Sequence, residues 1–195
     1  MRPWKHLLQG RVLNAGGGDR DLSPLVDGEL TNQDISEGLH NRNIHILSPL
    51  STVPRPDGYL HCVVCNAVLE HVNDPAVVLR ELHRVLSLGG HLYLTVPFMQ
   101  PEHLNPSDYQ RYIRDGLRLL AERAGFTVVA VEDLHNVYVT LGWLVYCWLT
   151  AKDTRVYRLL RRVLFPLLRY KSRHSTTRVP SMASAYRLIG RRSSP

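Results

Sequence analysis

The chain has few cysteines, no long apolar run and almost no acidic residues in its last third. Three cysteines in 195 residues do not support a disulfide framework. The longest uncharged apolar run, residues 137–151, is shorter than the roughly 20 residues of a transmembrane helix. The first residues lack the apolar segment and cleavage site of a signal peptide. We therefore expect a cytoplasmic protein, and the 44% hydrophobic content predicts one compact domain.

The two closely spaced cysteines, Cys62 and Cys65, have the spacing of a redox or zinc motif. Their neighbours, YLHCVVCNAV, have the pattern of a β-strand. Side chains three positions apart in a strand point to opposite faces of the sheet. We therefore interpret both cysteines as buried apolar residues.

The net charge of +7 is concentrated after Asp133. Beyond that residue Asp153 is the only acid among a dozen lysines and arginines. An anionic partner or surface is therefore expected for this segment and not for the whole fold. Nucleic acid is not the expected partner, because the basic residues belong to no recognised binding module.

The first 134 residues alternate between predicted strands and helices. Asp74 is a suitable N-cap and Pro75 a suitable first residue for a helix that we expect to end at Gly89–Gly90. A second helix is predicted at residues 115–124. The predicted strands are residues 11–15, 28–34, 43–49, 59–65, 91–96 and 126–133.

This alternation predicts an α/β fold with a mostly parallel sheet. Ligands of such sheets bind outside the carboxyl ends of the strands. Three features follow predicted strands here: the glycines at 16–18, Asp34, and the NAVLEHV segment at 66–72. Their convergence on one edge predicts a binding site there.

The segment after residue 134 has a different character. Residues 137–150 are aromatic and apolar, and residues 153–174 form an amphipathic pattern in which Pro166 is expected to kink or break the helix. One face of that helix carries Arg155, Arg158, Arg162 and Arg169, and another carries Val156, Leu159, Val163 and Leu167. We therefore divide the chain into a core at 1–134, a helical segment at 135–180, and a last strand with a basic tail at 181–195.

The glycine loop follows the first predicted strand in the stretch RVLNAGGGDRD. Gly16 and Gly18 match the first two glycines of the dinucleotide fingerprint G-x-G-x-x-G, but Asp21 occupies the third position. The lysine and hydroxyl residue of a phosphate-binding P-loop are also missing. These absences disfavour a dinucleotide or a nucleoside triphosphate and predict a ligand without phosphate.

Several stretches resemble a known family. VLNAGGGD resembles motif I of class I S-adenosylmethionine-dependent methyltransferases. CNAVLEHVNDPAVVLRELHRVLSLGGHLYLTVPF and HLNPSDYQRYIRDGLRLLAERAGF resemble the type-11 methyltransferase family, in the same order. The resemblance covers roughly residues 11–133. It implies a Rossmann-like, doubly wound class I methyltransferase fold, here with a helical C-terminal addition, and S-adenosylmethionine as the cofactor.

The resemblance also implies where the cofactor lies. The methionine portion would lie over Asn14, Ala15, Gly16, Gly17 and Gly18, and Asp34 would bind the ribose hydroxyls. Leu50 and Ser51 would lie near the adenine, and Asn66, Ala67 and Leu69 near the sulfonium. Asn14 departs from the family pattern, which has an acid there, and the connection between the first two strands is short. These departures keep a catalytically weakened protein open as an alternative.

Methyl transfer to an activated sulfonium needs positioning, and a base only where the acceptor must lose a proton. The candidate catalytic residues are His71 and His103. The alternatives are a capping or packing role for His71 and a loop-stabilising pair of His103 with Asp108. Arg111 and Tyr112 are expected to brace the same region. No group of residues has metal-ligand spacing along the sequence, so we predict no metal.

Two interpretations remain open for residues 135–180. They form either a helical cap over the substrate pocket or an interfacial helix on an anionic membrane, with Trp143, Tyr146 and Trp148 at the headgroups. The predicted activity is methyl transfer to a small molecule, for which a glycan or a lipid-linked precursor is an option. The alternative is a weakened methyltransferase fold that binds a partner or membrane through its basic helix. The oligomeric state cannot be predicted.

Overall fold

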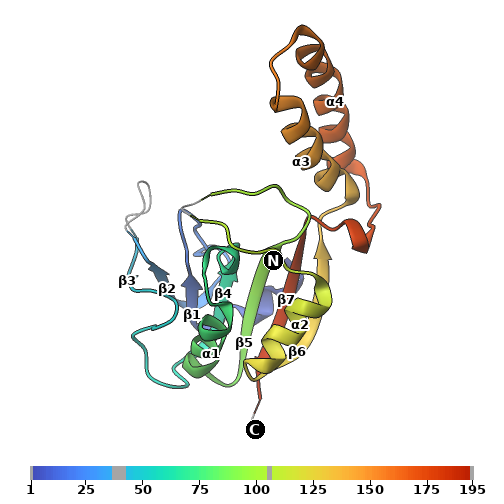
Figure 1. Cartoon of the computed structure of the whole chain (residues 1–195). Helices are drawn as coiled ribbons and strands as arrows, with labels where there is room; N and C mark the ends of the chain where they lie inside the picture. Colours follow the sequence, from blue (N-terminus) through green and yellow to red (C-terminus); the bar gives the residue numbers. More distant parts are fainter. Residues whose placement is uncertain (1, 37–42, 105–106, 194–195) are drawn as a thin grey trace.

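A computed structural model describes residues 2–36, 43–104 and 107–193. Its centre is a seven-stranded sheet in the order β3-β2-β1-β4-β5-β7-β6 (Figure 1). The strands are β1 (Gln9–Ala15), β2 (Asp27–Asp34), β3 (Ile46–Leu47), β4 (Leu60–Asn66), β5 (Leu86–Pro97), β6 (Phe126–Leu134) and β7 (Ala185–Arg192). All neighbours pair in parallel except β7, which runs antiparallel between β5 and β6.

This strand order confirms the predicted α/β class and the Rossmann-like topology. From β1 the chain proceeds outward to β2 and β3, and from β4 it proceeds to the other side. The order therefore reverses between β1 and β4, and their carboxyl ends flank a topological switch point. This is the position at which ligands bind in open α/β sheets.

The two faces of the sheet are covered differently. Helices α1 (Pro75–Val85) and α2 (Arg114–Arg123) share one apolar core cluster with the sheet. The other face is covered by the 3₁₀ helix η1 (Arg2–Leu7) and by apolar residues of the 22–26 segment. Residues 16–26, all described, contain no helix.

The cysteine prediction is confirmed by these two clusters. Cys62 packs in the cluster beneath η1, and Cys65 packs in the cluster beneath α1 and α2. Burial raises the pKa of each thiol to about 12, with the Glu70 carboxylate adding to the effect at Cys65. Both thiols are therefore protonated at neutral pH and are poor ligands and nucleophiles.

Helix α1 begins as predicted but ends earlier. The Asp74 carboxylate accepts hydrogen bonds from the backbone N–H groups of Ala76 and Val77, both at 3.1 Å. The predicted end at Gly89–Gly90 is wrong, because the helix stops at Val85 and β5 starts at Leu86. Leu86 is fully buried and pairs with β4, so sheet pairing ends the helix before the glycines are reached.

The helical segment is an insertion between β6 and β7 and precedes the last strand of the sheet. Helices α3 (Val137–Thr150) and α4 (Arg155–His174) pack against each other as a hairpin. A short 3₁₀ helix, η3 (Pro180–Met182), then leads into β7. The predicted last strand is thus present and completes the sheet.

The sequence predicts a kink or a break at Pro166; there is no break, and the helix continues from Arg155 to His174. Proline leaves the carbonyl four residues earlier, at Arg162, without a helical partner. Arg162 and Pro166 are both exposed, so water is available to that carbonyl and the helix tolerates the loss. No described helix is long and apolar enough to span a bilayer.

Candidate functional site

The glycine loop is held by the end of β2 through three consecutive backbone N–H groups. Gly16 donates to the Gln33 side-chain oxygen at 3.0 Å, and Gly17 donates to the Gln33 carbonyl at 3.0 Å. Gly18 donates to an oxygen of the Asp34 carboxylate at 2.9 Å. A phosphate cradle needs such groups pointing at the ligand. Here they are used within the protein, which agrees with a ligand that lacks phosphate.

The loop after β1 touches the segment after β4 at the switch point. A Cβ placed on Gly16, whose φ is +63°, would lie 2.6 Å from a methyl group of Val68. The neighbouring Ala67 also has a positive φ, 55°, which is uncommon for a residue other than glycine and typical of functional sites. The structure therefore brings Gly16 and Ala67, predicted from separate motifs, to one place.

Asn14 lies inside the protein beneath the glycine loop. Its side chain donates to the Asn32 side-chain oxygen at 3.0 Å and to the Arg20 carbonyl at 3.2 Å, and the residue is 2% exposed. A Cβ on Gly17 would lie 2.7 Å from the Asn14 amide nitrogen. In this structure Asn14 thus fixes the shape of the loop to β2.

The remaining predicted cofactor residues lie at the same edge in different environments. Ala15, Leu50 and Leu69 belong to the apolar core. Asn66 ends β4, and its side-chain oxygen accepts a hydrogen bond from the Thr95 hydroxyl at the end of β5. Ser51 is exposed. The roles of these residues toward a cofactor stay predictions.

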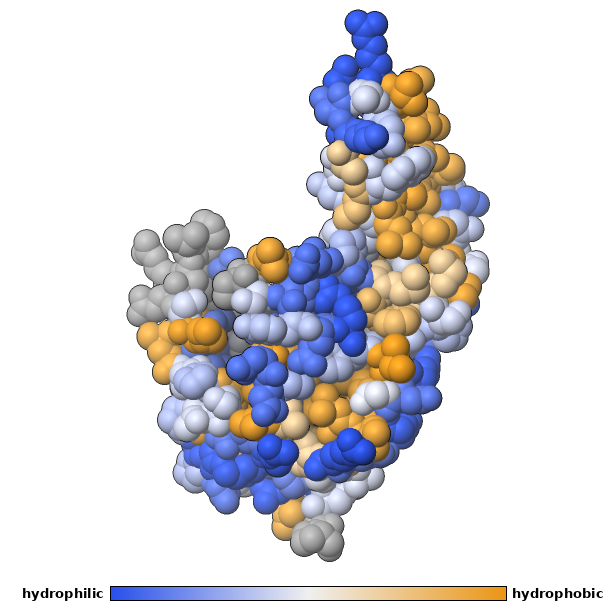
Figure 2. Space-filling view, viewed as in Figure 1, coloured by the Kyte–Doolittle hydropathy of each residue, from blue (hydrophilic) through white to orange (hydrophobic). Residues whose placement is uncertain are grey.

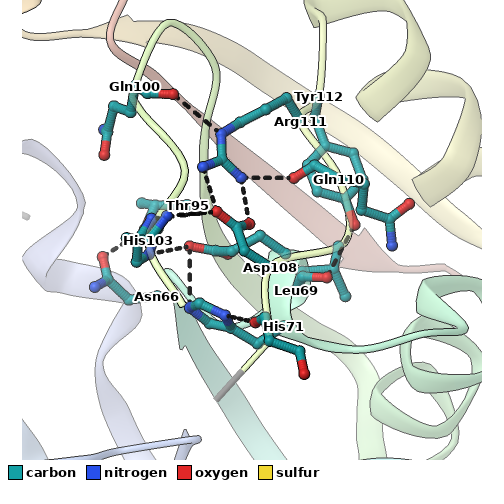
Figure 3. A network of polar contacts seen from close by, with 12 residues as sticks. Asn66, Leu69, His71, Thr95, Gln100, His103, Asp108, Gln110, Arg111 and Tyr112 are labelled. Carbon is teal, nitrogen blue, oxygen red and sulfur yellow. Dashed lines mark hydrogen bonds and ion pairs between the residues drawn. The ribbon is translucent and has the colours of Figure 1, made fainter. Parts of the chain in front are cut away.

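A second cluster joins Glu70, His71 and His103 (Figure 3). Glu70 and His71 belong to the 3₁₀ helix η2 (Leu69–His71), directly after β4, and His103 comes from the loop after β5. The Glu70 Oε1 atom lies 3.8 Å from His71 Nε2 and 3.7 Å from His103 Nε2. The two imidazole rings meet edge to face, with centroids 4.9 Å apart. Thus both predicted catalytic histidines face one carboxylate.

The loop between β5 and α2 is fastened over η2 (Figure 3). The Tyr112 hydroxyl donates to the Leu69 carbonyl at 3.0 Å, and the Tyr109 N–H donates to the Glu70 carbonyl at 2.8 Å. Arg111 forms a two-pronged ion pair with Asp108 and donates to the Pro101 carbonyl at 2.8 Å. The predicted bracing role of Arg111 and Tyr112 is confirmed.

Asp108 links this brace to the cluster. Its carboxylate accepts a 2.8 Å hydrogen bond from the His103 backbone N–H and lies 3.6 Å from His103 Nδ1. The hydrogen bonds from the Arg111 guanidinium hold the pKa of Asp108 far below its usual range, so this carboxylate stays ionised. The loop-stabilising interpretation of Asp108 therefore agrees with its contacts.

The Glu70 carboxylate, unlike that of Asp108, lacks the partners that usually accompany a buried charge. The side chain is fully buried, and neither carboxylate oxygen accepts a hydrogen bond from the other residues that the structure describes. Burial raises its pKa, while its own backbone N–H and then His71, His103 and Arg111 act in the opposite direction. An ionised carboxylate in this position is costly unless a cation accompanies it.

Sequence reasoning missed the grouping of Glu70 with the two histidines and the support from Gln33. Residues 70 and 103 lie far apart in the chain and meet only because the loop folds back over η2. Gln33 precedes the predicted Asp34 on β2, and nothing in its spacing separates it from an ordinary buried strand residue. The sequence did contain one signal for Glu70. The polar pair Glu70–His71 follows closely after an apolar strand.

A surface depression at the other edge of the sheet is separate from this site. It is lined by residues at the amino ends of strands, including Gly10, His61 and His91. Parallel sheets bind their ligands at the carboxyl ends, so the glycine loop and η2 remain the candidate site.

Residues 3–131 match a family model described as a methyltransferase domain. The chain belongs to this family. The match covers β1 to the first part of β6, including the glycine loop, η2 and the loop that carries His103. The resemblance to class I S-adenosylmethionine-dependent methyltransferases is thereby confirmed, and S-adenosylmethionine is the cofactor type of such domains.

This methyltransferase domain is similar to a curated protein, the uncharacterized 37.1 kDa protein in transposon TN4556 of Streptomyces fradiae. The two are 32% identical over 108 residues, which cover 47% of this chain and 31% of that protein. The chain therefore matches about a third of that relative's length.

Solved structures show the same fold at low sequence identity. The 1,6-didemethyltoxoflavin-N1-methyltransferase of Burkholderia thailandensis, solved with S-adenosylhomocysteine, has a TM-score of 0.63 at 15% identity, covering 99% of this chain and 78% of that one. The [4+2]-cyclase SpnF has a TM-score of 0.64 at 15% identity, covering 97% and 78%. One fold thus carries proteins named for different reactions, so the activity must be argued from the site.

Proposed function

We propose that this methyltransferase domain transfers a methyl group from S-adenosylmethionine to a small-molecule acceptor. One observation carries the proposal: the glycine loop after β1 and the segment after β4 meet at the switch point, as the contact between Gly16 and Val68 shows. The η2 cluster with its two histidines follows directly in the chain. A cofactor on the glycines would thus present its methyl group toward this cluster.

The residues divide into three proposed roles. The glycine loop accepts the methionine portion, because side chains there would fill the space that the ligand needs. The Asp34 carboxylate binds the ribose hydroxyls while it continues to accept a hydrogen bond from the Gly18 N–H group. His71 and His103 orient the acceptor and remove a proton where its chemistry requires one.

Calorimetric titration with S-adenosylmethionine and S-adenosylhomocysteine tests the proposal. We expect one site with a Kd in the micromolar range, about −8 kcal/mol, for both ligands. The reduced dinucleotide NADH, which carries a pyrophosphate, serves as the control and should not bind, because the glycine N–H groups are engaged by Gln33 and Asp34. Absence of heat with millimolar S-adenosylhomocysteine would contradict the proposal.

The second candidate function is a catalytically weakened fold that acts through its helical hairpin. Asn14 favours it, because this uncharged residue replaces the usual acid and its amide is used by Asn32 and Arg20. The two candidates differ in one readout. A weakened protein would keep its hairpin interactions while binding S-adenosylhomocysteine weakly or not at all.

The hairpin of α3 and α4 projects from the sheet edge that carries the candidate site (Figure 1). Helix α3 starts three residues after the carboxyl end of β6, which is parallel to β5. All of α4 is described and none of its residues is buried. Its apolar face stays exposed at Val156, Leu159, Val163 and Leu167, by 51–63%. This arrangement favours an interfacial segment over a cap.

We infer that the hairpin rests on an anionic membrane and that the acceptor is lipid-linked. Orange apolar side chains run along the projecting hairpin, with blue polar side chains beside them (Figure 2). Trp143, Tyr146 and Trp148 are exposed on α3, as befits side chains that lie at headgroup level. The surrounding arginines and lysines complement anionic lipid. The protein would then be cytoplasmic and peripheral to the membrane.

Sedimentation with vesicles tests the hairpin. We expect binding to vesicles that contain phosphatidylserine and little binding to phosphatidylcholine alone, with affinity falling as salt rises. The double variant Leu159→Glu/Val163→Glu should weaken binding at least tenfold, about 1.4 kcal/mol. Leu88→Glu/Leu119→Glu is the matched control, because it makes the same charge change at exposed leucines outside the hairpin. Equal loss in both variants would argue against a hairpin-specific contact.

A further inference from the structure

The Glu70 carboxylate has an unusual environment for an acidic side chain. It is fully buried, and no other described residue donates a hydrogen bond to either oxygen. Buried carboxylates are ordinarily hydrogen-bonded or paired, because the desolvation of an isolated one is costly. The nearby Arg111 guanidinium is already engaged with Asp108. The groups left facing Glu70 are the two imidazoles.

The His71 ring is fixed in the tautomer of a metal ligand. Its Nδ1 atom lies 2.5 Å from the Ser107 carbonyl oxygen. A carbonyl only accepts hydrogen bonds, so Nδ1 carries the proton and Nε2 of the neutral ring carries the lone pair. That lone pair is on the nitrogen that faces Glu70, at 3.8 Å. Metal-ligating histidines have this arrangement, in which the other ring nitrogen donates to a carbonyl or carboxylate.

His103, on the opposite loop, is placed in a similar way, although its Nδ1 atom is beyond hydrogen-bond distance of the acceptor. Its Nδ1 atom lies 3.6 Å from the ionised Asp108 carboxylate, and its Nε2 atom lies 3.7 Å from Glu70 Oε1. Arg111 holds Asp108 in place through two contacts. Both histidines thus have an acceptor behind Nδ1 and the Glu70 carboxylate in front of Nε2.

The three ligand atoms fit one ion in number, type and spacing. All lie within 4.8 Å of one another. Two ligands of a tetrahedral zinc ion with bonds near 2.1 Å lie about 3.4 Å apart, a few tenths of an ångström closer than each histidine Nε2 atom lies to Glu70 Oε1 here. His103 sits on a loop with its side chain 45% exposed, so a small ring movement closes the difference. Two histidines and one glutamate with an open fourth position are the ligands of catalytic zinc.

We propose that Glu70, His71 and His103 form a binding site for one divalent cation of the zinc type, with an open position toward the acceptor side. The type and spacing of the three ligand atoms support the site independently of any reaction. Its role in methyl transfer rests on the proposed function. There, with both Nε2 atoms bound to the cation, a hydroxyl of the acceptor would occupy the open position and would release its proton to water, so that the cation takes over the role otherwise assigned to His71 and His103 as bases. The oxygen–carbon bond then forms as the sulfur–carbon bond breaks, and S-adenosylhomocysteine leaves.

Metal titration of chelator-treated protein tests the site. We expect Zn²⁺ to bind by calorimetry with 1:1 stoichiometry and a Kd of about 1 μM or below. Co²⁺ should produce the visible absorption of a tetrahedral nitrogen and oxygen site, and Zn²⁺ should displace it. Glu70→Gln, His71→Ala and His103→Ala should each weaken binding at least tenfold. His135→Ala is the control, because His135 contacts Ser184 outside the cluster and should bind Zn²⁺ as the wild type does.

The Glu70→Gln variant also distinguishes a loss of metal binding from a loss of folding. It removes a buried charge without a hydrogen bond, so its Tm without metal should be no lower than that of the wild type. The rise in Tm that Zn²⁺ gives the wild type should disappear. Unchanged Zn²⁺ affinity in this variant, or no binding at 100-fold the expected Kd, would overturn the inference. Titration of the same samples with S-adenosylhomocysteine separates the two proposals, since its binding does not require the cation.

Discussion

Replacing Gly16 with arginine is expected to remove S-adenosylmethionine binding while leaving the protein folded. Gly16 has a φ of +63° and touches Val68 at the switch point. An arginine there fills the space that we assign to the methionine portion. The left-handed backbone costs about 1–2 kcal/mol for a residue other than glycine, and the new Cβ must also displace the Val68 methyl groups at 2.6 and 2.7 Å, so the Tm of the variant is measured beside its Kd. We expect Kd to rise by more than about 100-fold, equivalent to about 2.7 kcal/mol, in calorimetric titration.

Gly58→Arg is the matched control for this prediction. Gly58 has a similar φ, +69°, and a Cβ there would meet its nearest atom only at 3.8 Å. It lies before β4, at the opposite edge from the glycine loop. The two variants therefore share the left-handed backbone and the added charge, but they differ in position, and only Gly16→Arg also displaces Val68. If both lost the ligand, or if Gly16→Arg bound it normally, the cofactor would not lie on the glycine loop.

The sequence was informative where the signals are local. The Asp74 cap, the Pro75 start and the apolar stripe of α1 depend on neighbouring residues, and the structure contains each of them. Strand periodicity alone predicts that the Cys62 and Cys65 side chains point to opposite faces of the sheet. The order of motifs along the chain was likewise sufficient for the family. These features need no knowledge of what packs against them.

Predictions failed where a distant segment decides the outcome. Helix α1 ends at Val85 because Leu86 pairs with Leu60 of β4, although the glycines that seemed to mark its end come later. The position of β7 between β5 and β6 depends on long-range pairing that no local pattern encodes. The Glu70 cluster likewise needs the loop after β5 to fold back. Spacing along the chain therefore did not reveal that the fold brings one ligand atom from each of Glu70, His71 and His103 within 4.8 Å of one another.

Replacing Gly28 is expected to have the opposite effect to replacing Gly16. The protein should lose much of its stability but bind the cofactor normally. Gly28 pairs with Gly10 at the start of β1 and β2, far along both strands from the glycine loop. A Cβ on Gly28 would lie 2.3 Å from the Gly10 carbonyl oxygen, and its φ is +140°. Both obstacles are backbone, so relief requires the two strands to separate at this end. We expect Gly28→Ala to lower the free energy of unfolding by about 3 kcal/mol.

Thermal and urea unfolding measure this effect, with a Tm roughly 6–12 °C below the wild type. Gly142→Ala is the control, because Gly142 lies within α3 and no atom lies within 4 Å of a Cβ placed there. Alanine in a helix interior is favoured over glycine by about 1 kcal/mol, so this variant should gain stability. At a temperature where Gly28→Ala is folded, its Kd for S-adenosylhomocysteine should equal that of the wild type. A loss of affinity without a loss of stability would mean that the amino edge of the sheet contributes to the ligand site, and the assignment of binding to the carboxyl edge would be wrong.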